Sequence, residues 1–186
     1  RRAAGALSSP RFYVLVNTKP KGLLVAPTGE TIVARWRRMF HELGIPVVLV
    51  GESLAYGQCG LEHLDDDVAA KGPLAGLLAL LEHARTGAAI AVASDMPNVS
   101  RSLVERLVNA PPASVIAASR RGRWEPFFAR YEVPRVLPVA RARAERGLDA
   151  LQGLLDECGA APLPLHADEE LELDDWDSPE DMIPGH

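Results

Sequence analysis

The chain has 186 residues, of which 47% are hydrophobic and 24% are charged, and its formal net charge is −5. This composition is that of one globular domain and excludes a disordered chain. No apolar run approaches the roughly 20 residues of a membrane span, and the acidic balance argues against a nucleic-acid-binding domain. Cys59 and Cys158 have no metal-ligand spacing and form no disulfide framework, so we expect a cytoplasmic protein.

The first part of the chain alternates strands and helices. Residues 1–11 are small and polar, and we expect them to be a disordered lead-in to a single domain over 12–186. The apolar runs 12–16 and 47–50 predict buried strands, and the segment 31–43 predicts the helix that joins them. This alternation is typical of a mostly parallel sheet with helices on both faces, so we predict a three-layer, Rossmann-like α/β fold.

The segment 72–97 contains a helix, a buried strand and a carboxylate in that order. Pro73 suits the first position of a helix, and leucines at helical spacing follow it. The apolar run 88–93 predicts a strand covered on both faces, so Asp95 follows its carboxyl end. Ligands of open α/β sheets bind at that edge, where a carboxylate can hold a divalent cation against phosphates. The alternative is that Asp95 only turns the chain.

The next segments continue the sheet. Ser102 and Glu105 match a capping box, which predicts the start of a helix. Residues 114–118 predict another short strand. Residues 120–132 have the pattern of a turn followed by an amphipathic strand, which we expect to be a small β insertion that covers the site.

The last part of the chain is predicted to be mainly helical. Residues 134–157 have a helical pattern, with interruptions expected near Pro138 and Gly147. The tail from 166 to 186 is acidic, and Ser178 is expected to open a last short helix with carboxylates in its first turn.

Five motifs occur in the order and spacing of one family and together cover nearly the whole chain. They are GPLAGLL at 72–78, SDMP at 94–97, RWEPFFARY at 123–131, ER at 145–146 and DSPEDM at 177–182. The chain therefore resembles the molybdenum cofactor guanylyltransferase (MobA) family, which shares the fold of sugar-phosphate nucleotidyltransferases. The resemblance implies transfer of GMP from Mg-GTP to molybdopterin with release of pyrophosphate, and hence Mg²⁺, GTP and molybdopterin as ligands.

The resemblance also assigns residues to the nucleotide. Asp95 matches the family's metal-binding aspartate, and Asp177 is expected to complete a two-carboxylate clamp on Mg²⁺. Asp65 matches the acidic residue that contacts guanine, and a carboxylate can accept hydrogen bonds from the N1–H and 2-amino groups of that ring. Lys21 matches the lysine that reaches the triphosphate, so Lys21 and Asp95 are the expected catalytic residues.

Further residues are expected to bind nucleotide or acceptor. On the nucleotide side these are Gly72 and Pro73, and on the pterin side they are Arg123, Trp124, Glu125 and Arg146. An Arg–Glu pair beside an exposed tryptophan is also typical of a stacked surface cluster, so that alternative stays open.

The chain departs from the family pattern at the phosphates. The family begins with a glycine-rich loop, LAGGxSxRMGxDK, whereas here the strand 12–16 is followed by NTKPKGLL, with neither glycine pair nor arginine. This change removes the usual nest of N–H donors for phosphate. Either catalysis is impaired, or the gene encodes the loop. The second departure is DWDSPE at 175–180, where the family has Asn-x-Asn-Thr-Pro-Glu, which adds a carboxylate.

Three functions are therefore open. Guanylyl transfer is favoured by GPLAG together with WEP, and the alternatives are a cytidylyl or other nucleotidyl transfer, or a non-catalytic MobA-like protein that binds cofactor or nucleotide. The resemblance implies molybdoenzyme apoproteins or their chaperones as partners, with no nucleic acid and no membrane.

Overall fold

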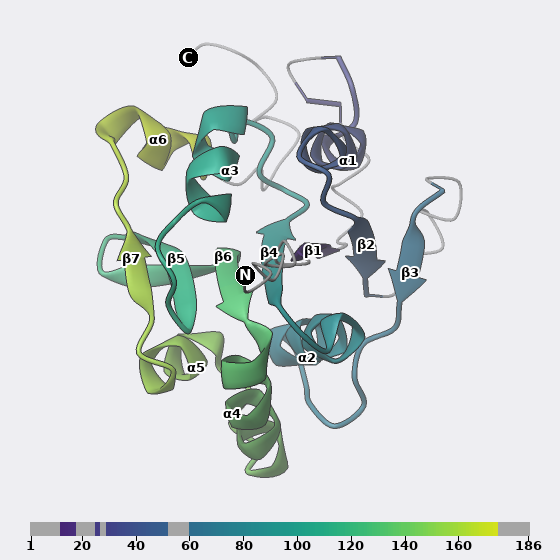
Figure 1. Ribbon diagram of the computed structural model, residues 1–186, viewed down its shortest axis with the longest axis vertical. Coiled ribbons are helices and arrows are strands. Elements are labelled where there is room, and N and C mark those ends of the chain that lie inside the picture. Colours follow the sequence, from purple (N-terminus) through teal and green to yellow (C-terminus); the bar gives the residue numbers. More distant parts are fainter. Residues whose placement is uncertain (1–11, 18–24, 27–28, 52–59, 175–186) are drawn as a thin grey trace, which may run out of the picture.

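One mixed sheet organises the molecule, which is described by a computed structural model over residues 12–17, 25–26, 29–51 and 60–174. The seven strands lie in the order β3-β2-β1-β4-β6-β5-β7 (Figure 1). They are β1 (Phe12–Asn17), β2 (Val47–Val50), β3 (Glu62–Leu64), β4 (Ala88–Ala93), β5 (Val115–Arg120), β6 (Arg123–Glu132) and β7 (Ala161–Leu163). β6 runs antiparallel to its neighbours β4 and β5, and the other pairings are parallel.

Helices cover both faces of this sheet, which confirms the predicted three-layer α/β fold (Figure 1). α1, α3 and α6 lie on one face, and α2, α4 and α5 lie on the other. The helices are α1 (Ile32–Glu42), α2 (Pro73–Ala84), α3 (Arg101–Val108), α4 (Val133–Glu145), α5 (Leu151–Glu157) and α6 (Ala167–Glu172). Within the described ranges, none of these helices has the length and apolarity that a bilayer span requires.

β4 shows why the sheet is buried from both sides. Ile90 and Val92 pack into the core under α1 and α3, whereas Ala89 and Ala91 pack into the core under α2 and α4. Because side chains alternate along a strand, a continuous apolar run serves both cores. The small alanines face α2, whose leucines fill that side.

The turn at 121–122 and the strand after it form as predicted, but this strand, β6, belongs to the main sheet and is not a separate cover over the site. β6 pairs Val92 of β4 with Phe128, and Ala117 of β5 with Ala129. Phe128 and Ala129 are fully buried because helices cover both faces there, whereas the beginning of the strand at Arg123 is exposed.

α3 begins earlier than predicted. Its N-cap is Ser100, whose side chain accepts a hydrogen bond from the Leu103 N–H at 3.2 Å. Ser102 therefore lies inside the helix, and Glu105 bonds to the Arg101 side chain at 2.8 Å instead of forming a capping box. The prediction placed the cap two positions late because both serines have the chemistry of an N-cap.

α4 continues through Pro138, where the sequence predicts an interruption. A proline removes the bond to the carbonyl four residues earlier, which here belongs to Pro134. Both prolines lie on the exposed side, where water can satisfy that carbonyl, while Val136 and Ala140 anchor the opposite side in the core. The expected break near Gly147 is confirmed, since α4 ends at Glu145.

Three further elements are short, and the two strands among them follow from pairing and not from a strong local pattern. β3 and β7 have three residues each, and α6 begins at Ala167 with three carboxylates in its first turn. Neither the expected lead-in 1–11 nor the helix expected at Ser178 falls within the described residues.

Candidate functional site

The carboxyl ends of four neighbouring parallel strands form one edge of the sheet. Their register aligns the last residues in a row, in the order Leu64, Val50, Asn17 and Ala93. Asp65 and Asp95 follow the two outer strands of this row and therefore lie at the same edge. They are three strand spacings apart, which is about 14 Å at the usual separation of strands.

Asp95 lies in the turn after β4, as predicted from the sequence. It is 9% exposed, between the buried Ser94 and Met96. A carboxylate is a suitable ligand for Mg²⁺, which proteins usually hold through one or two carboxylates, with water and phosphate oxygens as the other ligands. Among the described residues no group of three metal-binding side chains occurs.

Two residues expected beside Asp95 fall outside the described ranges. These are Asp177, the expected second ligand, and Lys21. Glu172, near the end of the described residues, lies close to the β4–α3 connection, because its side chain accepts a hydrogen bond from the Ser100 N–H at 2.7 Å. Asp177 follows Glu172 by only five positions in the sequence.

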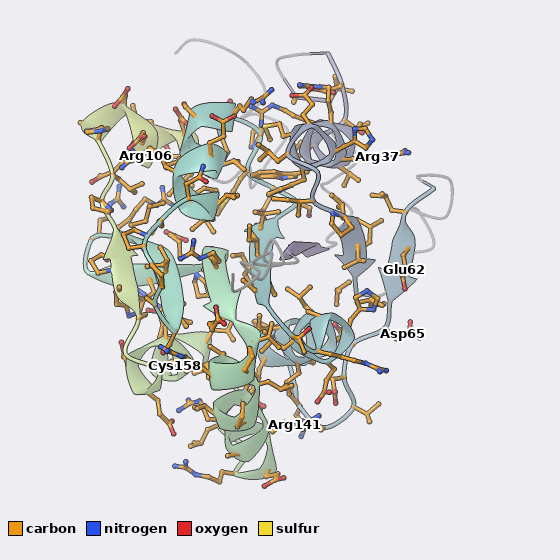
Figure 2. The ribbon with its side chains drawn as sticks, viewed as in Figure 1. Arg37, Glu62, Asp65, Arg106, Arg141 and Cys158 are labelled. Atoms are coloured by element: carbon orange, nitrogen blue, oxygen red, sulfur yellow. The ribbon has the colours of Figure 1, made fainter. Side chains whose placement is uncertain are left out.

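Asp65 is exposed at the end of β3, on the outer margin of the sheet (Figure 2). The end of β3 is fixed to β2 by a hydrogen bond from the Gly51 N–H to the Leu64 carbonyl, with a length of 3.1 Å. The carboxylate therefore stands on a defined edge, open to a ligand.

The beginning of α2 lies close to the end of β2. Gly72 is its N-cap, with φ +57° and ψ −143°, a backbone conformation that favours glycine, and Pro73 is its first residue. A Cβ at Gly76 would stand 3.2 Å from Asp66 Oδ1 and 3.4 Å from Val50 Cγ1, so this glycine permits the close approach. Gly76 was not predicted to be a functional residue, although it belongs to the GPLAG motif.

A pocket of about 450 Å³ lies at the beginning of β6. It is lined by Arg120, Arg121, Arg123, Trp124, Glu125, Pro126, Gln152 and Asp174. Since β6 is antiparallel and Val92 near the end of β4 pairs with Phe128, the residues before Phe128 extend past the carboxyl end of β4. The pocket therefore lies at the same edge of the sheet as Asp95.

Trp124 is held in the pocket by α5. Its backbone exchanges two hydrogen bonds with the Gln152 side chain, at 3.0 and 2.8 Å, and its indole N–H donates to Asp156 Oδ1 at 2.8 Å. Gln152 and Asp156 are four residues apart on one helix face, a spacing visible in the sequence, but their contact with Trp124 was not predicted.

Arg120 joins the pocket to the C-terminal part of the chain. It donates to Glu125 at 2.8 Å and to Asp174 at 2.7 Å. Burial acts against the charged guanidinium, but the bonds to the two carboxylates outweigh it and raise the pKa of Arg120. Arg121 and Arg123 are exposed and add two positive charges to the lining of the pocket.

The structure separates Arg146 from the other residues expected on the pterin side. Arg146 is the C-cap of α4, its guanidinium lies 3.9 Å from Glu157, and it does not line the pocket. Arg123, Trp124 and Glu125 do line it together.

A second hollow, of about 530 Å³, lies on the outer surface of α1. Its lining includes Arg37, labelled in Figure 2, with Arg38, His41 and Leu61. Among the described residues, none of those expected to bind nucleotide, metal or acceptor lines it.

Comparison with known proteins places this geometry in one family. The model of the MobA-like NTP transferase domain matches residues 3–158. The molybdenum cofactor guanylyltransferase of Pseudomonas putida is 34% identical, and the match covers 87% of this chain and 86% of that protein. The enzyme of the same name from Serratia proteamaculans is 30% identical, with 80% of this chain and 66% of that protein covered.

Solved structures share the fold. Molybdopterin-guanine dinucleotide biosynthesis protein A from Archaeoglobus fulgidus superposes with a TM-score of 0.71 at 17% identity, covering 92% of this chain and 94% of that one. The 2-C-methyl-D-erythritol 4-phosphate cytidylyltransferase of Thermus thermophilus has a TM-score of 0.66 at 18% identity, covering 94% and 96%. The family model and the relatives in sequence show that the chain belongs to the family of MobA-like NTP transferase domains.

Proposed function

We propose that this protein transfers GMP from Mg-GTP to molybdopterin and releases pyrophosphate. The observation that supports this most is the order of groups along one edge of the sheet. Asp65 follows β3, Asp95 follows β4, and the pocket around Trp124 lies at the beginning of the adjacent β6. The three positions correspond in order to the base, the phosphates and the acceptor, which is the order that the transfer of a nucleotide requires.

Asp65 is proposed to select the base. Its carboxylate can accept two hydrogen bonds from the N1–H and 2-amino groups of guanine, whereas adenine and cytosine present a ring acceptor at the corresponding edge. Gly72 and Pro73 begin the neighbouring helix α2, where the chain approaches the sheet edge closely enough to pack against a nucleotide.

Asp95, with Asp177, is proposed to hold Mg²⁺ against the phosphates. When bound, the ion neutralises the charge that develops toward pyrophosphate. Lys21 is proposed to contact the triphosphate, since it follows β1, which pairs directly with β4. A phosphate oxygen of the acceptor attacks the α-phosphorus in line, and it is already ionised at neutral pH, so we assign no protein base.

The pocket at β6 is proposed to bind the acceptor. Its fixed indole offers a flat surface for a heterocycle, and the exposed Arg121 and Arg123 can pair with the acceptor's phosphate. We propose that the product then passes in the cytoplasm to molybdoenzyme apoproteins or their chaperones.

Pyrophosphate release tests this proposal directly. The protein is given Mg²⁺ and molybdopterin with GTP, CTP or ATP in turn, and GTP is expected to react fastest. Asp95→Asn is expected to lower kcat by about 10²-fold or more, since it removes a charge that acts in the transition state. Asp168→Asn, a change of the same charge on the exposed side of α6, is the matched control and is expected to have no effect.

The same assay separates the alternatives. If the reaction is faster with CTP than with GTP, the protein is a cytidylyltransferase. CTP is included because the fold is also that of a cytidylyltransferase. Binding of GTP without pyrophosphate release would identify a protein that lost the glycine-rich loop together with its catalysis. Lys21→Ala is expected to lower kcat sharply in an active protein.

A further inference from the structure

The segment that carries Asp95 is fixed at both ends by consecutive residues of α1. We name residues 94–99 the Asp95 loop. At its beginning, Trp36 Nε1 donates a hydrogen bond to the Ala93 carbonyl at 3.1 Å. At its end, Arg35 Nη2 donates to the Val99 carbonyl. One turn of one helix therefore holds the two ends of the loop.

The end of the loop is fixed from two further sides. The N–H of Ser100 donates to Glu172 Oε2 at 2.7 Å, and the Ser100 side chain caps α3. Val99 itself is fully buried. The ends of the loop are thus held by contacts from α1 and from the end of α6.

Arg35 is an unusual residue for such an anchor. Its side chain is 8% exposed, and its Nε and Nη1 atoms are buried with no hydrogen-bond partner among the described residues. Burial lowers the pKa of Arg35, opposed by the nearby carboxylates of Glu30 and Glu172. Among the described residues, the Val99 carbonyl is the hydrogen-bond partner that the structure gives to this guanidinium.

We propose that Arg35 is a positioning residue for Asp95. Its bond to Val99 holds the Asp95 loop against α1, so that the carboxylate keeps the place at the sheet edge where it meets Mg²⁺ and phosphate. The identity of what Asp95 binds rests on the proposed function, whereas the restraint of the loop by Arg35 does not. A displacement of reacting groups by about 1 Å can lower a rate by about 10²-fold, so a restraint of this kind affects activity without any contact to substrate.

Arg130 provides a matched control. It is also 8% exposed, and it donates to the carbonyls of Leu107, Val108 and Pro111, at 3.3, 2.8 and 2.7 Å. Arg130→Met removes a buried guanidinium that bonds backbone carbonyls, as Arg35→Met does, but its bonds lie at the C-terminal end of α3 and just beyond it, so the bonds of Trp36 and Arg35 to the Asp95 loop stay in place.

Hydrogen exchange measures the restraint without any ligand. Arg35→Met is expected to speed exchange of the amides in residues 94–100 by about tenfold relative to wild type, while Arg130→Met leaves them unchanged. The second measurement is the Mg²⁺ concentration that half-saturates GTP binding. Arg35→Met is expected to raise it by about tenfold without changing the affinity for metal-free GTP. Arg35→Lys, which can still donate to the Val99 carbonyl, is expected to recover part of both effects.

Each outcome decides between positioning and a merely structural role. Equal effects of Arg35→Met and Arg130→Met on exchange and on the Mg²⁺ requirement would overturn the proposal, as would faster exchange with an unchanged requirement. If wild type binds no Mg-GTP, the proposed function fails, and exchange alone decides whether Arg35 restrains the loop. If Arg35→Met does not fold, Arg35→Lys is judged by the same two measurements.

Discussion

Two exposed arginines expected on the pterin side have different surroundings, and this difference can be tested. Arg123 lines the pocket beside Trp124, whereas Arg146 lies near Glu157 outside it. Arg123→Ala is expected to raise the KM for molybdopterin about tenfold, because a charge-assisted bond to a phosphate is lost. Arg146→Ala is expected to leave it unchanged. Steady-state kinetics with varied molybdopterin makes the comparison, and equal KM values for the two variants would contradict the assignment of the pocket.

At the scale of one element, the position of the cap of α3 has a measurable consequence. Ser100→Ala removes the bond to the Leu103 N–H and is expected to lower the free energy of unfolding by about 1 kcal/mol. For a chain of this size the melting temperature then falls by about 2–4 °C. Ser102→Ala, inside the same helix, is expected to change it much less. A larger effect at Ser102 than at Ser100 would restore the capping box predicted from the sequence.

Elements with a strong local pattern could be predicted, and those made by pairing could not. β2 and β4 match the predicted ranges because each is a continuous apolar run between turn residues. β3 is short and mostly exposed, and β7 contains Pro162, so neither has a strand pattern of its own. They form because β2 and β5 offer hydrogen bonds to a neighbouring strand.

The residues of the candidate site could likewise be predicted only in part. Asp95 could be placed at the sheet edge because it follows a strand with a strong local pattern. Asp65 was assigned by resemblance alone, since no strand was predicted before it. The bond between Trp124 and Asp156 joins residues 32 positions apart, and it depends on how α5 packs over β6. A single sequence gives no measure of that packing. The same holds for Arg35, whose bond to Val99 joins residues 64 positions apart.

For the whole molecule, acid should weaken the attachment of α6 to α3. Glu169 is 7% exposed and pairs with Arg106, which lowers the pKa of its carboxyl group. Because the folded pKa lies below the unfolded value, about 4.3, the stabilisation is complete above that value and is lost as the pH falls through the folded pKa. The free energy of unfolding of wild type is expected to exceed that of Glu169→Gln by about 1.5–3 kcal/mol at neutral pH. In strong acid the two free energies are expected to be equal.

Urea unfolding at several pH values measures this difference. Glu170→Gln, on the exposed side of the same helix turn, is the control and is expected to remain close to wild type at every pH. A difference between wild type and Glu169→Gln that persists unchanged in strong acid would show that Glu169 stabilises the fold by packing and not through its charge.

Binding of Mg-GTP along the sheet edge should also stabilise the folded molecule, and Asp65 and Asp95 are expected to make two separate contributions to this stabilisation. At a concentration of 100 times its Kd, Mg-GTP is expected to add about 2.7 kcal/mol, which raises the melting temperature by roughly 5–11 °C. Asp65→Ala is expected to reduce the shift with GTP to that seen with CTP, and Asp95→Ala to remove the part that requires Mg²⁺. Because the two carboxylates are proposed to contact different parts of the ligand, the base and the metal, the double variant is expected to lose about the sum of the two effects. A double variant no worse than either single one would mean that both carboxylates act on one shared group, and the nucleotide would then not lie along the edge from β3 to β4.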